Sequence, residues 1–175
     1  VGRIAPNKKQ EDVIRAFSCY QRFCNPKSRL ILVGSWSGAE SYYRRLCRYT
    51  AALQAENVLF TGHIPFPDIL AYYHVADLFL CMSEHEGFCV PLVEAMYFGV
   101  PILAYRACAV PDTLGDSGIL LDKKDPMETA MVADRILTDT SLRRELVARQ
   151  RRRQQDFSYG AVRALLESQL REFLK

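Results

Sequence analysis

The chain of 175 residues is 49% hydrophobic and 25% charged, and its formal net charge is +3. This length fits one domain, residues 1–175, that can bury a core without disulfides or metal ions. The mild positive charge suits a phosphate-bearing ligand and falls short of the basic surface of a nucleic-acid binder. No apolar run is long enough to span a membrane.

Short apolar runs alternate with helical patterns along the first two thirds of the chain. The apolar runs predict six strands, at residues 1–4, 29–34, 57–62, 77–83, 101–105 and 118–122. The spacing of hydrophobic residues predicts helices between them, at residues 11–23, 40–54, 66–76 and 91–99. From Pro126 onward the pattern predicts helices only, at residues 126–139, 141–155 and 158–175.

This alternation predicts an α/β fold: a Rossmann-like, doubly wound parallel sheet of about six strands, covered by helices on both faces. Right-handed crossovers give the strand order 3-2-1-4-5-6, in which the first and fourth strands are neighbours. Ligands of such sheets bind beyond the carboxyl ends of the strands, where the order reverses. We therefore expect the site between "RIAPNKK" after the first strand and "SEHEGFCVP" after the fourth.

The segment after the fourth strand carries two glutamates, Glu86 and Glu94. Pro91 suits the first turn of a helix, so the residues before it offer backbone N–H groups that can bind phosphates. These groups belong to Gly87, Phe88, Cys89 and Val90. We expect Glu86 in the loop, and Glu94 in the first helical turn, where it can accept hydrogen bonds from ribose hydroxyls. The alternative is that both are ordinary surface acids.

The segment after the first strand is basic, with Arg3 and Lys8 on either side of a Pro-Asn turn. A guanidinium and an ammonium group together suit a diphosphate, and ordinary surface charge is the alternative. The sequence has no G-x-G-x-x-G, Walker or D-x-D motif, so we expect neither a dinucleotide cofactor nor a metal ion. Small or polar residues after the second and third strands would border a nucleobase or form plain turns: Gly34, Ser35, His63 and Ile64.

The six cysteines form no C-x-x-C pair, and with the three histidines they show no metal-ligand spacing. We expect them to be small buried hydrophobic residues in a reducing, cytoplasmic compartment. The run "RQRRRQQ" at residues 149–155 predicts a solvated helix face. The alternative is docking to an anionic membrane or a lipid-linked substrate, peripherally at the inner face of the membrane.

With these residues placed, the sequence resembles the nucleotide-sugar-binding half of the retaining, GT-B-fold glycosyltransferases known as group 1 or family 4. Four segments carry the resemblance in the family's order: "VGRIAPNKKQEDVIRAF", "NVLFTGHI", "SEHEGFCVPLVEAMYFGVPILAY" with its E-x7-E signature, and "AVPDTLGDSGIL". Two positions depart from the family's pattern. Lys9 stands where Gly or Asn is common, and Cys89 stands where Gly is frequent.

The resemblance implies that Arg3 and Lys8 hold the donor diphosphate. Glu86 would lie near the donor sugar and the reacting centre, and Glu94 would bind the ribose, with loop amides on the sugar or phosphate. It implies transfer of a hexosyl group from a nucleoside diphosphate sugar with retention of configuration, without cofactor or metal. Polysaccharide, lipopolysaccharide or glycolipid synthesis is the expected setting.

The resemblance also implies an N-terminal acceptor domain as a partner. The chain opens on "VGRIAP" without an initiator Met, and we expect this acceptor domain to be missing from it and the chain alone to be inactive. Two alternatives remain. A sugar-nucleotide epimerase or phosphorylase of GT-B fold is disfavoured by the E-x7-E signature. A non-catalytic regulatory module is disfavoured because the basic and acidic site residues are retained.

Overall fold

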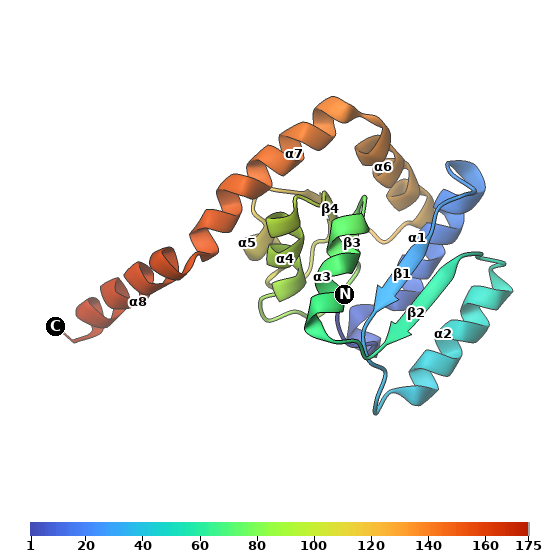
Figure 1. Cartoon of the computed structure of the whole chain (residues 1–175), viewed down its shortest axis with the longest axis horizontal. Helices are drawn as coiled ribbons and strands as arrows, with labels where there is room; N and C mark the ends of the chain where they lie inside the picture. The colour runs from blue at the N-terminus through green and yellow to red at the C-terminus, as the bar shows by residue number, and fades with distance from the viewer. Residues whose placement is uncertain (175) are drawn as a thin grey trace.

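The computed structural model describes residues 1–174 as an α/β fold with parallel strands (Figure 1). The strands are β1 (Leu30–Val33), β2 (Val58–Gly62), β3 (Phe79–Cys81), β4 (Ile102–Tyr105) and β5 (Ile119–Leu121). The α-helices are α1 (Gln10–Phe23), α2 (Glu40–Ala52), α3 (Phe66–Val75), α4 (Val90–Phe98), α5 (Val110–Leu114), α6 (Pro126–Thr138), α7 (Thr140–Arg153) and α8 (Tyr159–Phe173). Two 3-10 helices are η1 (Pro6–Lys8) and η2 (Gln154–Phe157).

The strands form two parallel sheets within residues 1–174. β1 pairs with β2 in one sheet, and β4 pairs with both β3 and β5 in the other. The parallel direction and the positions of these five strands confirm the sequence prediction. The short helix α5 was not predicted, because a five-residue helix with Pro at its start has too little periodicity to be recognised.

The prediction of six strands in one sheet was wrong, because residues 1–4 do not form a strand. Their backbone donates two hydrogen bonds toward β1, from Gly2 N to Val33 O and from Ile4 N to Ser35 O, both 2.9 Å long. Gly2 has a φ of 123°, which lies outside the strand region, so the segment does not complete a ladder. It runs between the two sheets and borders a cavity with β3.

Alternate residues of the three-stranded sheet pack into two hydrophobic cores, one on each face. Leu103 of β4 belongs to a core that includes Ile14 of α1 and Ile136 of α6. Its neighbour Ile102 belongs to a second core that includes Leu92 of α4. This two-residue period is that of a strand buried on both sides. Helices therefore cover both faces of the sheet, and β1 shares the first core through Leu32.

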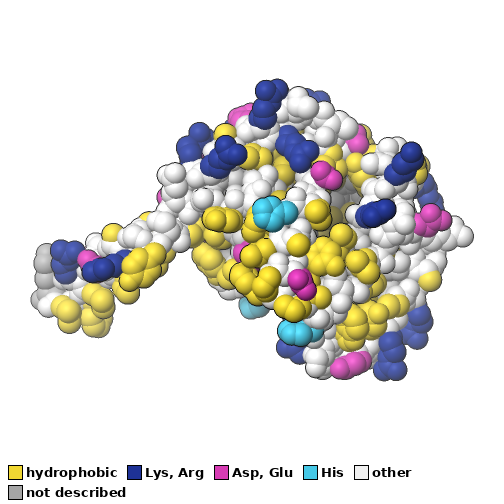
Figure 2. Space-filling model, in the orientation of Figure 1, with side chains coloured by type: hydrophobic (Ala, Val, Ile, Leu, Met, Phe, Trp, Pro, Cys, Tyr) yellow, Lys and Arg dark blue, Asp and Glu magenta, His cyan; other side chains and the backbone are white. Residues whose placement is uncertain are grey.

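The last helix stands apart from this packing. Figure 1 shows α8 extending away from the body of the molecule, and none of its residues is buried. Figure 2 shows apolar side chains along it, and its exposed residues include Leu165, Leu166 and Phe173. Even so, none of the helices described for residues 1–174 combines the length and the apolar character needed to cross a bilayer.

Candidate functional site

The loops that follow the N-terminal segment and β3 meet, as the sequence predicted from the strand order. Lys8 Nζ lies 2.7 and 2.8 Å from the two carboxylate oxygens of Glu86. Two further bonds join the same loops: Asn7 Nδ2 donates to His85 O at 3.2 Å, and Glu84 N donates to Asn7 O at 2.9 Å. Glu86 is buried and Lys8 is partly exposed, so the pair lies at the edge of the solvent.

A tight turn delivers Lys8 to this position. The 3-10 helix η1 ends at Lys8, and Lys9 then adopts the left-handed conformation, with φ 51° and ψ 47°, before α1 begins. Gly and Asn tolerate this conformation better than other residues do. The structure thus explains why Gly or Asn is common at this position in the family that the sequence resembles. Lys9 also forms an ion pair with Glu84 at 3.0 Å, and this hydrogen bond raises the pKa of Lys9.

The loop before α4 has unused backbone donors. Within residues 1–174, no hydrogen bond is donated by the N–H groups of Gly87, Phe88, Cys89 and Val90. The carbonyl groups of this loop, by contrast, accept hydrogen bonds from the segment around α5. Thr113 Oγ1 donates to Phe88 O at 2.6 Å, and Ala109 N donates to Glu86 O at 3.4 Å. The loop is therefore supported through its carbonyl groups while four consecutive amides remain available to an anion.

The helix that carries Glu94 starts one residue earlier than predicted. Cys89 is its N-cap in the left-handed conformation, with φ 67° and ψ 61°, and Val90 is its first residue. Cys89 occupies the second position where Gly is frequent in the family, and the same backbone preference explains this. Glu94 is consequently the fifth residue of α4, so the prediction that it lies in the first helical turn was wrong by one position.

Glu94 is held by a residue of α3. Tyr73 Oη donates to Glu94 Oε2 at 2.8 Å, and the Tyr73 side chain is buried. Burial, together with this hydrogen bond, raises the pKa of Tyr73 well above its ordinary value. The phenol therefore remains a donor across the physiological range and fixes one carboxylate oxygen of Glu94, while the second oxygen can accept bonds from a ligand.

The remaining predicted residues lie in the N-terminal segment and in the loops after β1 and β2. Arg3 is exposed, and its Nη2 donates to Ser37 O at 3.0 Å in the loop after β1 instead of approaching Glu86. Gly34 has a φ of 146°, and a Cβ there would lie 2.0 Å from Gly2 O, so its role in the fold is to let the N-terminal segment approach. Ser35, beside it, is half-buried and accepts the Ile4 amide through its carbonyl.

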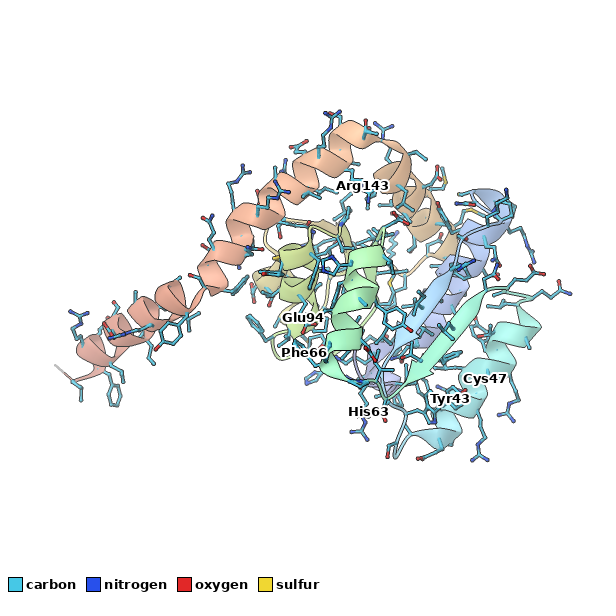
Figure 3. The ribbon with its side chains drawn as sticks, viewed as in Figure 1. Tyr43, Cys47, His63, Phe66, Glu94 and Arg143 are labelled. Atoms are coloured by element: carbon cyan, nitrogen blue, oxygen red, sulfur yellow. The ribbon has the colours of Figure 1, made fainter. Side chains whose placement is uncertain are left out.

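The loop after β2 contains exposed His63 and half-buried Ile64. Figure 3 shows His63 in the stretch that leads into α3 and Glu94 on the neighbouring α4. A bridge between Gly34 and Gly62 ties this loop to the loop after β1. The structure thus brings Lys8 and Glu86 into contact, and it places the other predicted residues on the N-terminal segment, on α4 and on the loops after β1, β2 and β3.

Sequence reasoning missed three residues that position the site: Asn7, Tyr73 and Thr113. Asn7 stands inside the recognised turn, and its place between two site residues is the one signal that could have identified it. Tyr73 and Thr113 act across 21 and 25 residues of sequence, so no local pattern connects them with their partners.

Three potential metal ligands also lie together, although the sequence showed no metal-ligand spacing. The side-chain donor atoms of Cys81, Glu86 and Cys89 are all within 4.8 Å of one another. In this arrangement Lys8 already occupies both oxygens of Glu86. A metal ion would have to displace that ammonium group, so the cluster does not overturn the expectation of a site without metal.

Comparisons with known proteins give consistent matches. Residues 1–153 match the family described as "Glycosyl transferases group 1". The chain is 28% identical over 172 residues to the D-inositol 3-phosphate glycosyltransferase of Corynebacterium diphtheriae, which covers 96% of this chain and 40% of the relative. It is 27% identical over 159 residues to the serotype-specific mannosyltransferase WbdA of Escherichia coli, and the match covers 90% of this chain and 19% of that protein.

Solved structures have the same fold. The crystal structure of Anabaena Alr3699/HepE in complex with UDP and glucose aligns with a TM-score of 0.83 at 24% identity, covering 98% of this chain and 47% of that one. The chain therefore spans less than half the length of each of these three proteins.

Proposed function

Because the chain belongs to the group 1 glycosyl transferases, we propose that it is the domain that binds a nucleoside diphosphate sugar. In the complete enzyme, the sugar is transferred to an acceptor with retention of configuration. The fold corresponds to the C-terminal half of the GT-B glycosyltransferases. The proposal also includes an acceptor domain outside this chain, which the greater length of the relatives supports.

One observation carries the proposal: the ion pair between Lys8 and Glu86 lies beside the four free amides that precede α4. A cation and unpaired N–H groups at a helix N-terminus form a binding site for phosphate oxygens. A carboxylate in the same place suits the hydroxyls of a sugar. Between them these groups match the two chemically different parts of a nucleoside diphosphate sugar.

Each side chain then has a distinct role. Lys8 and Arg3 bind the diphosphate, and Arg3 reaches it by leaving its contact with Ser37 O. Glu94, oriented by Tyr73, accepts hydrogen bonds from the ribose. The loops after β1 and β2, with Gly34, Ser35, His63 and Ile64, border the base. Glu86 faces the donor sugar once Lys8 has turned to the phosphates.

The catalysis that follows is electrostatic. Negative charge grows on the diphosphate as the bond to the sugar breaks, and Lys8, Arg3 and the loop amides stabilise this charge. The loop amides need little reorganisation because the α5 contacts already hold the loop, whereas Lys8 and Arg3 must first leave Glu86 and Ser37 O. This scheme uses the chain's own groups and calls for no metal ion or cofactor.

The direct test is calorimetric titration of the chain with UDP, GDP and ADP. We expect one of the three to bind, and Glu94→Ala to weaken it at least about tenfold, which corresponds to roughly 1.4 kcal/mol. Glu94→Gln keeps an acceptor for Tyr73 and controls for the loss of that hydrogen bond. Glu128→Ala, an exposed glutamate on α6, is the matched control and should bind like the unaltered chain.

Two results would count against the proposal. One is that no nucleotide binds at millimolar concentration, either to the chain or to the chain combined with its acceptor domain. The other is that Glu94→Ala and Glu128→Ala bind equally well. Circular dichroism of each variant separates a binding defect from a failure to fold.

A peripheral position at the cytoplasmic face of a membrane is a second part of the proposal. Figure 2 shows Lys and Arg side chains along α7, where Arg144, Arg151 and Arg152 are exposed. Such a row attracts anionic lipid. Flotation of the chain with vesicles of phosphatidylglycerol, compared with neutral phosphatidylcholine vesicles, tests it: equal flotation, or none, contradicts this part.

A further inference from the structure

Two buried cysteines meet at the candidate site. Cys81 is the last residue of β3, and Cys89 is the N-cap of α4. Their sulfur atoms lie within 4.8 Å of each other, and each residue is only 6% exposed. Both are free thiols in the structure. A disulfide requires the two sulfurs to approach to about 2.05 Å, so its formation would draw them closer together.

The surroundings of Cys81 favour its thiolate. Cys81 Sγ donates a hydrogen bond to Ser83 Oγ at 3.6 Å, and the Cys89 sulfur lies beside it. The contact with Cys89, followed by those with Ser83, outweighs burial and lowers the pKa of Cys81. The same contact, together with burial, raises the pKa of Cys89. Because the two sulfurs lie together beside one cavity, one can attack a small oxidant and the other can react with the product.

A small cavity lined by both apolar and polar residues reaches both thiols. Its volume is about 50 Å³, and its walls include Cys81, Cys89, Ser83, Glu86 and Lys8. This space can hold a small molecule such as water or hydrogen peroxide. The Lys8 ammonium group beside it can stabilise the negative charge that leaves a peroxide when its O–O bond breaks.

From this geometry we propose that Cys81 and Cys89 are a reversible thiol–disulfide pair that hydrogen peroxide oxidises. The Cys81 thiolate attacks one peroxide oxygen, the O–O bond breaks, and the departing hydroxide takes a proton and leaves as water. The product is a sulfenic acid on Cys81. The Cys89 sulfur then displaces its hydroxyl group, which leaves as a second water, and the S–S bond forms. The two sulfurs together lose two electrons, and the peroxide gains them.

The bond would close a short loop that contains Glu86 and the free amides before α4. Oxidation would therefore fix the spacing between the end of β3 and the start of α4, where the candidate site lies. The formation of the disulfide itself does not depend on the proposed function, because it follows from the two thiols and the cavity. The experiment below reads the bond directly.

The sequence makes the bond easy to detect. No Lys or Arg lies between Arg48 and Arg106, so trypsin releases both cysteines in one peptide, residues 49–106, which holds no other cysteine. Glu84 and Glu86 lie between the two cysteines, so a glutamate-specific protease divides the loop. A disulfide then keeps the two pieces joined until a reductant separates them.

The test is to treat the reduced chain with hydrogen peroxide, unfold it, alkylate the free thiols and analyse the digests by mass spectrometry. We expect a loss of two alkylated thiols per chain, a joined pair of peptides around Cys81 and Cys89, and full reversal by dithiothreitol. Cys89→Ser should abolish the joined pair and leave a sulfenic acid on Cys81, which dimedone traps. Cys108→Ser, which removes an exposed thiol 3.8 Å from His85 Nδ1, should change nothing.

Three results would overturn the proposal. The first is that Cys81 and Cys89 remain fully alkylated, and the second is that Cys108 or another cysteine forms the bond. The third is protection of both thiols by Zn²⁺, reversed by a chelator, without any joined peptide, which would make the cluster a metal site instead. The unfolding transition of Cys89→Ser, compared with that of Cys89→Ala, shows whether the variants are folded when the thiols are counted.

Discussion

At the scale of single residues, two backbone conformations account for two departures of this chain from its family's pattern. Lys9 and Cys89 both have left-handed backbones, and both stand where glycine is common. Both side chains make contacts: Lys9 forms an ion pair with Glu84, and Cys89 packs in a core beside Cys81. Each position therefore trades backbone strain for a side-chain contact that glycine could not make.

We expect Lys9→Gly to raise the free energy of unfolding by roughly 0.5–1 kcal/mol. Relief of the left-handed conformation contributes about 1–2 kcal/mol, while the greater freedom of glycine in the unfolded chain offsets about half of it. The exposed ion pair with Glu84 adds little. Urea denaturation measures the difference. Lys123→Gly, at an exposed position without a left-handed backbone, should be neutral or destabilising, and equal effects would contradict the strain.

The contact between Tyr73 and Glu94 predicts a pH dependence at alkaline pH. The pKa of Tyr73 is raised in the folded chain, whereas an unfolded tyrosine titrates near 10. The stabilisation is therefore complete below about pH 10 and is lost above it, because the unfolded chain then releases a proton that the folded chain keeps. The slope for one group approaches about 1.4 kcal/mol per pH unit.

Tyr73→Phe should remove this slope. At pH 7 the variant should be about 1–3 kcal/mol less stable, because Glu94 loses its donor. The difference from the unaltered chain should then shrink between about pH 10 and 11.5. Urea denaturation across that range tests it. Tyr159→Phe, a change to an exposed tyrosine, should show no such convergence. If the free energy of unfolding of Tyr73→Phe changes with pH in parallel with that of the unaltered chain, the Tyr73 proton is not linked to folding.

At the scale of elements, α5 supports the candidate site although none of the predicted site residues lies on it. We expect Thr113→Val to lower the free energy of unfolding by about 1 kcal/mol through loss of the bond to Phe88 O. Nucleotide affinity should fall as well, since the loop amides lose their support. Thr138→Val removes a similar 2.7 Å bond to Asp134 O on α6. It should affect stability alone, so equal affinities of the two variants would contradict the role of α5.

The elements also show how much of the fold and of the candidate site the sequence predicts. Apolar runs located five strands, because buried parallel strands are continuously apolar. Strand order then predicted the meeting of Lys8 and Glu86, which the structure confirms. The apolar residues Val1 and Ile4 predict a strand at residues 1–4, but the conformation of Gly2 depends on contacts with Val33 that no local pattern records.

The hydrogen-bond partners of Glu94 and Phe88 could not be predicted from the sequence, for a related reason. These partners, Tyr73 and Thr113, lie on α3 and α5, which come close to the site because they pack against α4. The sequence shows which residue carries a polar group, but the packing of the helices in the core determines the hydrogen-bond partner of that group. Arg3 illustrates the same limit, since its contact with Ser37 depends on where the loop after β1 comes to lie.

At the scale of the whole molecule, α8 contributes little to the stability of the chain. Ending the chain after Ser158 should change the free energy of unfolding by less than about 0.5 kcal/mol, because no residue of α8 is buried. Self-association should decrease, since the exposed apolar side chains of α8 are removed. Urea denaturation and sedimentation velocity measure the two effects.

A longer truncation is the control for that experiment. Ending the chain after Thr138 also removes α7, whose Leu146 and Gln150 are buried, and should abolish cooperative unfolding. A large loss of stability from the removal of α8 alone would contradict the packing described above.

The two sheets have a consequence for how this molecule responds to its ligand. No ladder joins β1 and β2 to the other three strands, and the N-terminal segment lies along this seam. Arg3 and Lys8 come from one side of the seam, while Glu86 and the free amides come from the other. A diphosphate held by both would act as a clamp across the seam. Its binding energy would then oppose separation of the two halves and make the domain stiffer as well as more stable.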